Sequence, residues 1–426
     1  MSNLDYTPIQ ETPAPEAAVE DHSDVDRIRP LPRISIHAFC ETDGLAQTLD
    51  RCTQDRRMAK VHARINSGGV QAAANMYAGS STPNLLILET SQNTQNLMAD
   101  LAQLAEVCDP ETRVVIVGHV NDVTLYRELI RNGISEYIVA PVSMADIISV
   151  ISAIFVDPDA APLGRSIAFI GAKGGVGSST IAHNCAWSIS ELFESETILA
   201  DLDLAFGTAN LDFNNDPAQG ISEAVNSPDR LDEVFLDRLL AKCSQHLSML
   251  AAPSMLDRTY DFEGDAFLPV LDILQRNAPV SILDIPHAWN AWTRQILTNV
   301  DEIVITATPD LANLRNTKNF YDTLAKLRPN DTPPLLVLNQ VGVAKRPEIA
   351  IDVFCEPLGI EPVAIIPFEA LLFGDASNSG LMIGEANSKS PIAESISQLA
   401  HIVTGRSETK KRKKSGLSGL MGLLGR

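Results

Sequence analysis

Between about residue 32 and residue 156 the chain alternates short apolar runs with longer segments that carry hydrophobic residues at helical spacing. The apolar runs predict strands at 33–39, 84–90, 113–118 and 136–142. The segments between and after them predict helices at 44–60, 93–107, 123–133 and 143–155. Strands that alternate with helices in this way indicate parallel βαβ units in a doubly wound sheet.

A second and longer alternation begins at about residue 165 and ends near residue 405. Its apolar runs predict strands at 165–171, 197–202, 247–252, 280–285, 302–307, 334–339 and 362–366. A helix is predicted at 312–328. The fold class is therefore expected to be α/β, with two doubly wound parallel-sheet domains. The predicted divisions are a disordered leader at 1–31, domains at 32–156 and 165–405, a linker at 157–164, and a basic amphipathic tail at 406–426.

The composition suits a cytoplasmic protein of two or three domains. The chain has 426 residues, of which 45% are hydrophobic, and it contains no run of 18 apolar residues. The N-terminal sequence has neither the basic start nor the apolar core of a secretory signal. Its six cysteines are scattered without a CxxC pair, so we expect buried thiols in a reducing compartment rather than disulfides or a metal cluster.

The charge is strongly negative and unevenly distributed. The whole chain carries a formal charge of −21, and residues 161–405 account for −16 of it, whereas residues 406–426 carry +6. An acidic body disfavours sequence-independent binding to nucleic acid, which requires a basic face.

The segment "GAKGGVGSST" at 171–180 has the features of a phosphate-binding loop. It follows a predicted apolar strand and opens a predicted helix, which is the context that such a loop needs. Its glycines allow backbone N–H groups to face phosphate oxygens, and the helix N-terminus adds a favourable dipole. Ser179 offers a hydroxyl to Mg²⁺, but Ser178 stands where such a loop normally has its lysine.

This loop resembles the deviant Walker A motif of the ParA/MinD ATPases, K-G-G-x-G-K-[ST]-[ST]. The resemblance implies that Lys173 is the signature lysine, which reaches the phosphates of the partner across a nucleotide-sandwich homodimer. It also implies that the whole loop binds ATP through Lys173, Gly174, Gly175, Val176, Gly177, Ser178, Ser179 and Thr180. Ser178 departs from the motif, and its lysine is the one that this chain lacks.

Further ParA/MinD-like segments follow in the same order as in that family. "ILADLDLAFGTANLD" at 198–212 resembles the Asp-x-Asp segment, which implies that Asp201 helps to place Mg²⁺ and that Asp203 lies near the attacking water. "SILDIPH" at 281–287 resembles the Walker B strand, with Asp284 holding Mg²⁺ through water. Asn339 then corresponds to the adenine-contacting asparagine, and Pro367 would flank the base. The implied catalytic residues are Lys173 and Asp203, and the implied metal residues are Ser179, Asp201 and Asp284.

The first domain resembles a response-regulator receiver that has lost its chemistry. Strand one runs into Phe39-Cys40-Glu41 rather than an acidic pair, strand three ends at Glu89, and Ala140 occupies the lysine position. We therefore expect no Mg²⁺-assisted phosphoryl transfer. A scaffold for protein contacts is the favoured interpretation, and a phosphate-mimicking role for Glu89 is the alternative.

A receiver-like domain in front of such an ATPase resembles the CpaE/TadZ proteins of type IVc (Flp, tight-adherence) pilus systems. The resemblance implies a dimeric localisation factor that recruits pilus assembly proteins, or polar landmark proteins, to the cell pole. Loss of the loop lysine removes a charge-assisted contact of roughly 1.5–3 kcal/mol, so we expect at most a slow ATPase. The alternatives are a non-hydrolysing pseudo-ATPase scaffold and a ParA/MinD-like partitioning or division-site ATPase.

Two smaller features leave alternatives open. The tail "KKRKKSGLSGLMGLLGR" at 410–426 combines a basic cluster with leucines at helical spacing, which favours contact with an anionic membrane. A partner-docking peptide and a solubilising tail are the other interpretations. His287 is interpreted as a plain loop histidine in preference to a sensor of the γ-phosphate.

Overall fold

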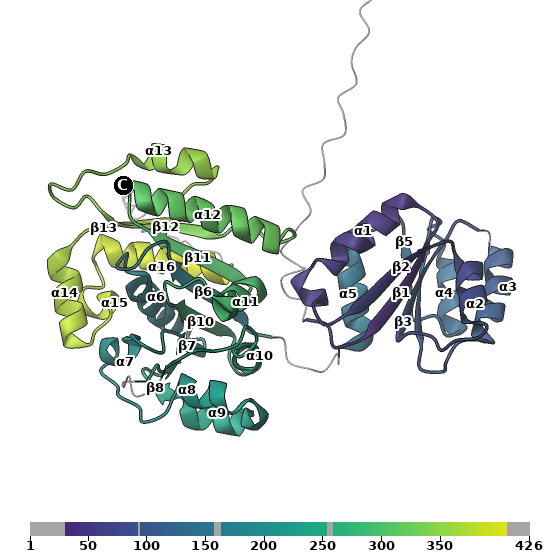
Figure 1. Cartoon of the computed structure of the whole chain (residues 1–426), viewed down its shortest axis with the longest axis horizontal. Coiled ribbons are helices and arrows are strands. Elements are labelled where there is room, and N and C mark those ends of the chain that lie inside the picture. The colour runs from purple at the N-terminus through teal and green to yellow at the C-terminus, as the bar shows by residue number, and fades with distance from the viewer. Residues whose placement is uncertain (1–29, 93, 157–162, 254–258, 407–426) are drawn as a thin grey trace, which may run out of the picture.

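The structure is a computed structural model that describes residues 30–92, 94–156, 163–253 and 259–406. It contains two sheets, one of five strands in the order β2-β1-β3-β4-β5 and one of eight in the order β13-β12-β11-β6-β10-β7-β9-β8 (Figure 1). Every strand pair is parallel except β8 with β9, which are antiparallel. The predicted fold class, α/β with two parallel sheets, is confirmed.

The first sheet has the strand order of a flavodoxin-like fold. Its strands are β1 (Ser35–Cys40), β2 (His62–Ser67), β3 (Leu85–Thr90), β4 (Arg113–Gly118) and β5 (Glu136–Val139). Its helices are α1 (Asp43–Thr53), the short η2 (Arg56–Met58), α2 (Val70–Tyr77), α3 (Thr94–Ala105), α4 (Val123–Arg131) and α5 (Met144–Phe155). All six residues of the central strand β3 are buried, and the two faces of the sheet support separate apolar cores.

Two elements of this sheet differ from the prediction. Strand β2 and helix α2 were not predicted, because "HARINS" lies at the sheet edge with only half-exposed or exposed residues and so carries no apolar run. The helix predicted at 44–60 ends at Thr53 and is followed by η2. Leu31, which was assigned to the leader, is 1% exposed and belongs to the first core. The other predicted leader residues, apart from Pro30, lie outside the described residues.

The second sheet places the candidate phosphate-binding loop at its centre. The strands are β6 (Arg165–Gly171), β7 (Thr197–Asp201), β8 (Ala241–Lys242), β9 (Leu247–Leu250), β10 (Val280–Ile285), β11 (Glu302–Ala307), β12 (Leu335–Val341) and β13 (Ala364–Pro367). The helices are α6 (Ser178–Phe193), α7 (Ala209–Asp212), α8 (Ile221–Asn226), η3 (Pro228–Arg230), α9 (Glu233–Leu239), α10 (Leu268–Asn277), α11 (Ala291–Asn299), α12 (Leu311–Leu327), α13 (Ile351–Cys355), η4 (Glu356–Leu358), α14 (Ala370–Ser379), α15 (Ile383–Ala386) and α16 (Pro391–Thr404).

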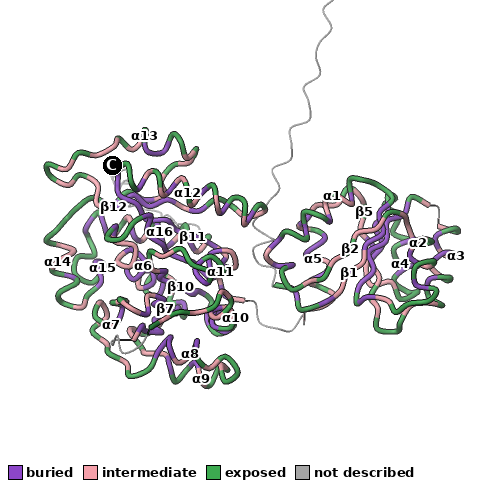
Figure 2. Tube along the Cα trace, viewed as in Figure 1, coloured by how far each residue is buried: buried purple, intermediate pink, exposed green. Residues whose placement is uncertain are grey.

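Strand alternation decides which side chains of this sheet face helix α6. Successive residues of a strand point to opposite faces. Leu199 and Ile282 belong to the core under α6 and α16, so Asp201 and Asp284, each two residues further on, point to that same face. Figure 2 shows the strands of this sheet as a mostly buried layer between partly exposed helices.

The edges of the predicted linker and tail are ordered. Gly164, assigned to the linker, donates its N–H to the Gln275 carbonyl at 2.6 Å, and a Cβ there would lie 1.7 Å from the Ala278 oxygen. Arg406, the first residue of the predicted tail, lies over the Phe193 ring at 4.5 Å. The rest of the tail lies outside the described residues.

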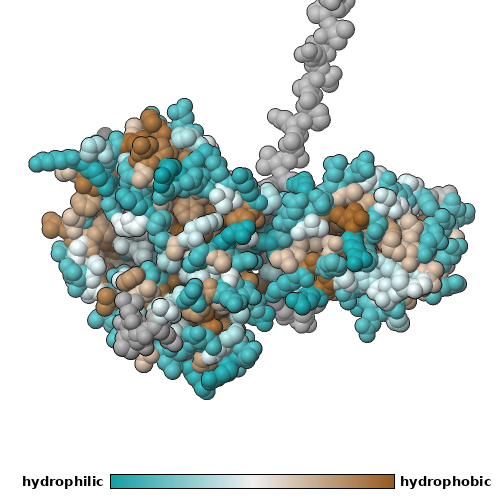
Figure 3. Space-filling view, viewed as in Figure 1, coloured by the Kyte–Doolittle hydropathy of each residue, from teal (hydrophilic) through white to brown (hydrophobic). Residues whose placement is uncertain are grey.

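Most of the surface drawn in Figure 3 is hydrophilic, with a hydrophobic area over the region of α13, where Val353 is 51% exposed. Among the described helices, none combines the length and the hydropathy that crossing a membrane requires.

A buried ion pair connects the residues around the first sheet with those around the second. Arg56, from η2 beside the first sheet, lies 2.7 Å from Asp301 and 3.5 Å from Asp331, which flank β11 and α12 of the second. Its guanidinium also donates to the Asn299 carbonyl at 3.3 Å. Burial alone would raise the pKa of Asp301, but Arg56 and the Ser166 N–H and hydroxyl outweigh it and hold that pKa below its usual value. This contact therefore stabilises the arrangement above the ordinary carboxyl pKa and is lost as the pH falls through the lowered one.

Replacing Arg56 should separate the two parts of the chain. Removing one partner of a buried ion pair typically costs about 3–5 kcal/mol. Asp301 keeps its Ser166 donors and Asp331 keeps Arg328, so the cost should lie at the lower end of that range. We expect Arg56→Ala to lower the thermal unfolding midpoint and to increase the radius of gyration measured by small-angle X-ray scattering. The control is Arg131→Ala, which removes an exposed arginine of α4. Unchanged scattering for Arg56→Ala would contradict a joining role for the pair.

Candidate functional site

The loop between β6 and α6 has the backbone shape that a phosphate cradle requires. Gly175 and Gly177 have φ angles of 82° and 84°, in the left-handed region that favours glycine. A Cβ on Gly177 would also approach the Asn339 side-chain nitrogen to 2.6 Å. Helix α6 begins directly after Gly177, so its first free N–H groups point back towards the loop.

Two side chains of β12, which lies two strands away from β6 in the sheet, donate hydrogen bonds to this loop. The Asn339 side chain, 5% exposed at the end of β12, donates to the Val176 carbonyl at 2.8 Å, and Gln340 donates to the Gly175 carbonyl at 3.0 Å. The predicted adenine-contacting residue thus has an observed contact with the loop itself. Contact of Asn339 with a base stays a prediction.

The start of the loop is fixed in the same way. His287 Nδ1 contacts the Gly171 carbonyl at 2.8 Å, and the Asn316 side chain donates to the Ala172 carbonyl at 2.8 Å. This contact gives His287 a structural task, and the plain loop histidine favoured from the sequence stays a prediction. His287, Asn316 and Trp289 also line a hollow of about 310 Å³ beside Ala172.

Two buried carboxylates lie side by side near the loop. Asp201 and Asp284 are register partners on adjacent strands β7 and β10, and they are 0% and 2% exposed. Burial, and then the nearby charge of Asp284, raise the pKa of Asp201 to about 7. Two like charges so close in a dry site are unfavourable unless a cation neutralises them.

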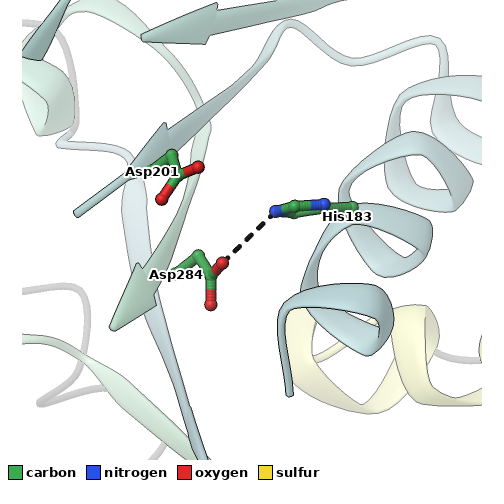
Figure 4. A group of neighbouring side chains, drawn as sticks. All are labelled: His183, Asp201 and Asp284. Carbon is green, nitrogen blue, oxygen red and sulfur yellow. Dashed lines mark ion pairs between the residues drawn. The ribbon is translucent and has the colours of Figure 1, made fainter. Parts of the chain in front are cut away.

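His183 of helix α6 supplies the nearest positive charge. It is 0% exposed, and its Nδ1 lies 2.7 Å from Asp212 Oδ2 while its Nε2 lies 3.3 Å from Asp284 Oδ2 (Figure 4). Burial alone would lower the pKa of His183, but Asp212 and Asp284 outweigh it and raise the pKa to about 10. The sequence analysis missed this residue, because a single histidine inside an apolar helix gives no signal until the sheet brings Asp284 opposite it.

Asp201 and Asp203 organise the segment after β7. Asp201 accepts the Asp203 N–H at 3.1 Å through one carboxylate oxygen and the Ala209 N–H at 3.2 Å through the other. Asp203 in turn accepts the Phe206 N–H at 3.0 Å. A Cβ at Gly207 would lie 2.3 Å from an Asp201 oxygen, so this turn needs glycine.

The site contains buried polar atoms that the described residues leave without a hydrogen-bond partner. Both carboxylate oxygens of Asp284, Nε2 of His183 and Oγ of Ser178 are in this state. Donor atoms of His183, Asp201 and Asp284 lie within 4.8 Å of one another. The unpartnered carboxylate oxygens of Asp284, beside the Asp201 carboxylate, are the kind of ligand that Mg²⁺ takes, so these two acids fit the Mg²⁺ that the fold implies.

The remaining predicted residues lie around this centre. Lys173 and Gly174 are exposed at the loop tip, and Val176 is buried beneath it. Ser179 and Thr180 are half-buried in the first turn of α6. Pro367 is exposed at the end of β13. The structure therefore gathers the loop, Asp201, Asp203 and Asp284 at one edge of the sheet, and the chemical roles assigned to them from the resemblance stay predictions.

At the corresponding edge of the first sheet, the Glu89 carboxylate of β3 is hydrogen-bonded to the segment that follows β1. Glu89 is 0% exposed and accepts hydrogen bonds from the Glu41 N–H at 2.7 Å and from the Thr42 N–H and hydroxyl at 2.8 and 2.7 Å. His119 Nε2 lies 3.1 Å from the same carboxylate. Glu89 is thus a buried carboxyl group held by protein donors, and the absence of phosphoryl transfer to it stays a prediction.

Comparison with known proteins finds several similar proteins, and no family model matches the chain. The structure resembles a ParA family ATPase from Chlorobium tepidum, with a TM-score of 0.51, 24% identity, and coverage of 55% of this chain and 98% of that one. The septum site-determining protein MinD of Thermotoga maritima is 23% identical over 250 residues, which are 57% of this chain and 89% of the relative. A pilus assembly protein CpaE from Caulobacter crescentus is 41% identical over 30% of this chain and 98% of its own, with a TM-score of 0.30.

The hydrogen bond from the Asn339 side chain to the Val176 carbonyl should stabilise the phosphate-binding loop, and removing it tests this. We expect Asn339→Ala to destabilise the protein by about 1–3 kcal/mol, because the buried Val176 carbonyl loses its partner. Gln340→Ala, which removes the more exposed bond to Gly175, should cost less than about 1 kcal/mol. Urea unfolding of both variants measures the difference, and equal costs would show that Asn339 does not support the loop.

Proposed function

Because the larger sheet has the P-loop NTPase fold of the ParA/MinD type, we propose that this chain binds ATP with Mg²⁺ and that the bound state controls its self-association. The single observation that carries the proposal is the glycine loop, with left-handed Gly175 and Gly177, directly beside the buried pair Asp201 and Asp284. Such a pairing of a phosphate cradle with a cation-requiring acid pair matches the chemistry of a bound metal–nucleotide complex.

The proposed division of labour follows from the position of each group. Backbone N–H groups of the loop and of the α6 N-terminus bind the phosphates. Ser179, Asp201 and Asp284 hold the metal, which would supply positive charge to the β- and γ-phosphate oxygens. Asp203, on the turn after β7, orients the attacking water. Lys173 is exposed at the loop tip, where it can extend to the phosphates of a second copy.

Slow turnover is part of the proposal. Ser178 occupies the lysine position, and its buried hydroxyl offers no positive charge to the phosphates. Losing that charge costs roughly 1.5–3 kcal/mol. Lys173, if delivered by the second copy, restores part of it only when two chains meet, so hydrolysis would be tied to dimerisation. A non-hydrolysing scaffold is the second candidate, and the observation that favours it is Ser178 itself.

The proposed biological output is assembly of type IVc pili. Its support is the order of motifs along the chain, the flavodoxin-like strand order of the first sheet, and the 41% sequence identity to a pilus assembly protein over part of the chain. In this proposal the ATP-bound dimer recruits pilus assembly or polar landmark proteins, and the receiver-like domain provides protein contacts without phosphorylation.

Two loop variants test the role of Lys173. We expect wild type to dimerise in ATP and Mg²⁺ and to hydrolyse ATP slowly. Lys173→Ala should still bind ATP but should dimerise at least about tenfold more weakly, because one charge-assisted contact per site is lost. Ser178→Lys should hydrolyse ATP about ten- to hundredfold faster than wild type. Analytical ultracentrifugation and phosphate release measure these effects.

Lys345→Ala, which changes a lysine outside the loop, serves as the control for these variants. Unaltered dimerisation of Lys173→Ala would overturn the trans-lysine part of the proposal. Absence of ATP binding by wild type at millimolar ATP would leave only the scaffold function.

Membrane contact through residues 410–426 is a separate part of the proposal. Five consecutive basic residues should each add about 1 kcal/mol of attraction near an anionic bilayer. We expect the full chain to sediment with vesicles that contain anionic lipid, and a chain lacking 410–426 to remain in the supernatant. Neutral vesicles are the control, and equal sedimentation of both chains would contradict the proposal.

A further inference from the structure

We propose that His183 is a nitrogen ligand of the metal site and that the site therefore prefers a transition-metal dication such as Mn²⁺ to Mg²⁺. The proposal concerns the metal site of the function proposed above, but it needs no nucleotide to be tested. It rests on three features of the described residues: the donor set, the partner of the histidine ring, and the unsatisfied carboxylate opposite it.

The donor set is one imidazole and two carboxylates. Donor atoms of His183, Asp201 and Asp284 lie within 4.8 Å of one another, and all three residues are buried (Figure 4). Metal–ligand bonds of about 2.1 Å span two donors roughly 4.2 Å apart, so side-chain movements of about half an ångström bring the three atoms to one ion. The site draws on β7, β10 and α6, which the fold already holds together.

The second feature is the partner of the imidazole ring. Metal-ligating histidines usually donate their other ring N–H to a carboxylate, which fixes the ring and directs the free nitrogen at the metal. His183 has this arrangement, since Nδ1 lies 2.7 Å from Asp212 Oδ2 and Nε2 is directed towards Asp284. Asp212 belongs to α7 and is 18% exposed at its side chain, so it is a positioning residue outside the buried centre.

The third feature is the group that Nε2 faces. Asp284 is 2% exposed, and neither of its carboxylate oxygens has a hydrogen-bond partner among the described residues. Nε2 of His183 lies 3.3 Å from Asp284 Oδ2 and makes no hydrogen bond to any of the described residues. A metal ion between His183 Nε2 and Asp284 Oδ2 replaces their 3.3 Å contact with one metal–ligand bond to each atom. The Nε2 proton is released to solvent as the metal binds.

The nitrogen donor decides which metal the site prefers. Mg²⁺ takes oxygen ligands almost exclusively, whereas imidazole suits first-row transition metals. Carboxylates suit Mn²⁺ as they suit Mg²⁺, but Mn²⁺ is also a first-row transition metal that nitrogen sites bind, so it can use all three donors.

The test uses the full-length, nucleotide-free protein after removal of metals with a chelator. Mn²⁺ is titrated and its free signal is followed by electron paramagnetic resonance, with and without competing Mg²⁺. Pulsed measurements on the bound ion then detect coupling to a directly ligated ¹⁴N nucleus. We expect one tightly bound Mn²⁺ per chain, clear ¹⁴N coupling, and displacement only by a large excess of Mg²⁺.

Three variants make the assignment specific. His183→Gln should lose the ¹⁴N coupling, and its preference for Mn²⁺ over Mg²⁺ should fall at least about tenfold. Asp212→Asn should keep the coupling but bind Mn²⁺ about ten- to hundredfold more weakly, because the ring loses its orienting carboxylate. His246→Gln, which changes a histidine paired with Glu196 elsewhere, should behave as wild type.

Two results would overturn the proposal: Mn²⁺ bound to wild type without ¹⁴N coupling, or no Mn²⁺ bound at millimolar concentration. If His183→Gln proves unfolded by circular dichroism, the wild-type ¹⁴N signal and the Asp212→Asn affinity still decide. ATP binding in Mg²⁺, measured on the same preparation, separates the two proposals. Loss of ¹⁴N coupling with intact ATP binding refutes only the nitrogen ligand, and ¹⁴N coupling without ATP binding refutes only the proposed nucleotide function.

Discussion

The burial of two like charges in register is the constraint on which the rest of the site depends. Asp201 and Asp284 end neighbouring strands at paired positions, and the period of two along each strand turns both side chains towards helix α6. Such a pair is costly in a dry environment unless a cation or a network of donors compensates it. His183 from α6 and the backbone N–H groups on Asp201 compensate part of this charge, and the unpartnered oxygens of Asp284 remain as donors for a divalent ion.

The loop lacks its usual lysine, and the positive charge of the site lies at other positions. Ser178 leaves the phosphate side of the site without a cation, while in the metal-free protein His183 places one on the carboxylate side, five residues further along the same helix. Lys173 is exposed at the loop tip, where the proposed dimer would present it to the second copy. In this account the loop and the acid pair still bind a nucleotide and its metal. The position that accelerates hydrolysis, Ser178, carries no positive charge, which favours a stable assembly over rapid turnover.

The sequence predicted those parts of the fold that are strongly apolar and regular. Strands such as β3 and β10 are buried along their whole length and were found from their apolar runs. Strand β2 was not predicted, because an edge strand with half-exposed and exposed residues has no apolar run. In the candidate site, the motif order named Asp201 and Asp284, but His183 could not be found. Its relevance depends on how α6 packs over β10, which is a tertiary property and leaves no periodic signal in the chain.

The most direct test of the central claim is hydrogen–deuterium exchange of the wild-type chain with and without ATP and a divalent cation. The account predicts that peptides covering 171–183 become protected when both are present, because the loop and the first turns of α6 hold the phosphates and the metal. It also predicts unchanged exchange at Glu89 and its neighbours in the first sheet. Protection confined to other segments, or no change in the loop at saturating ATP, would contradict the claim that this loop binds a nucleotide.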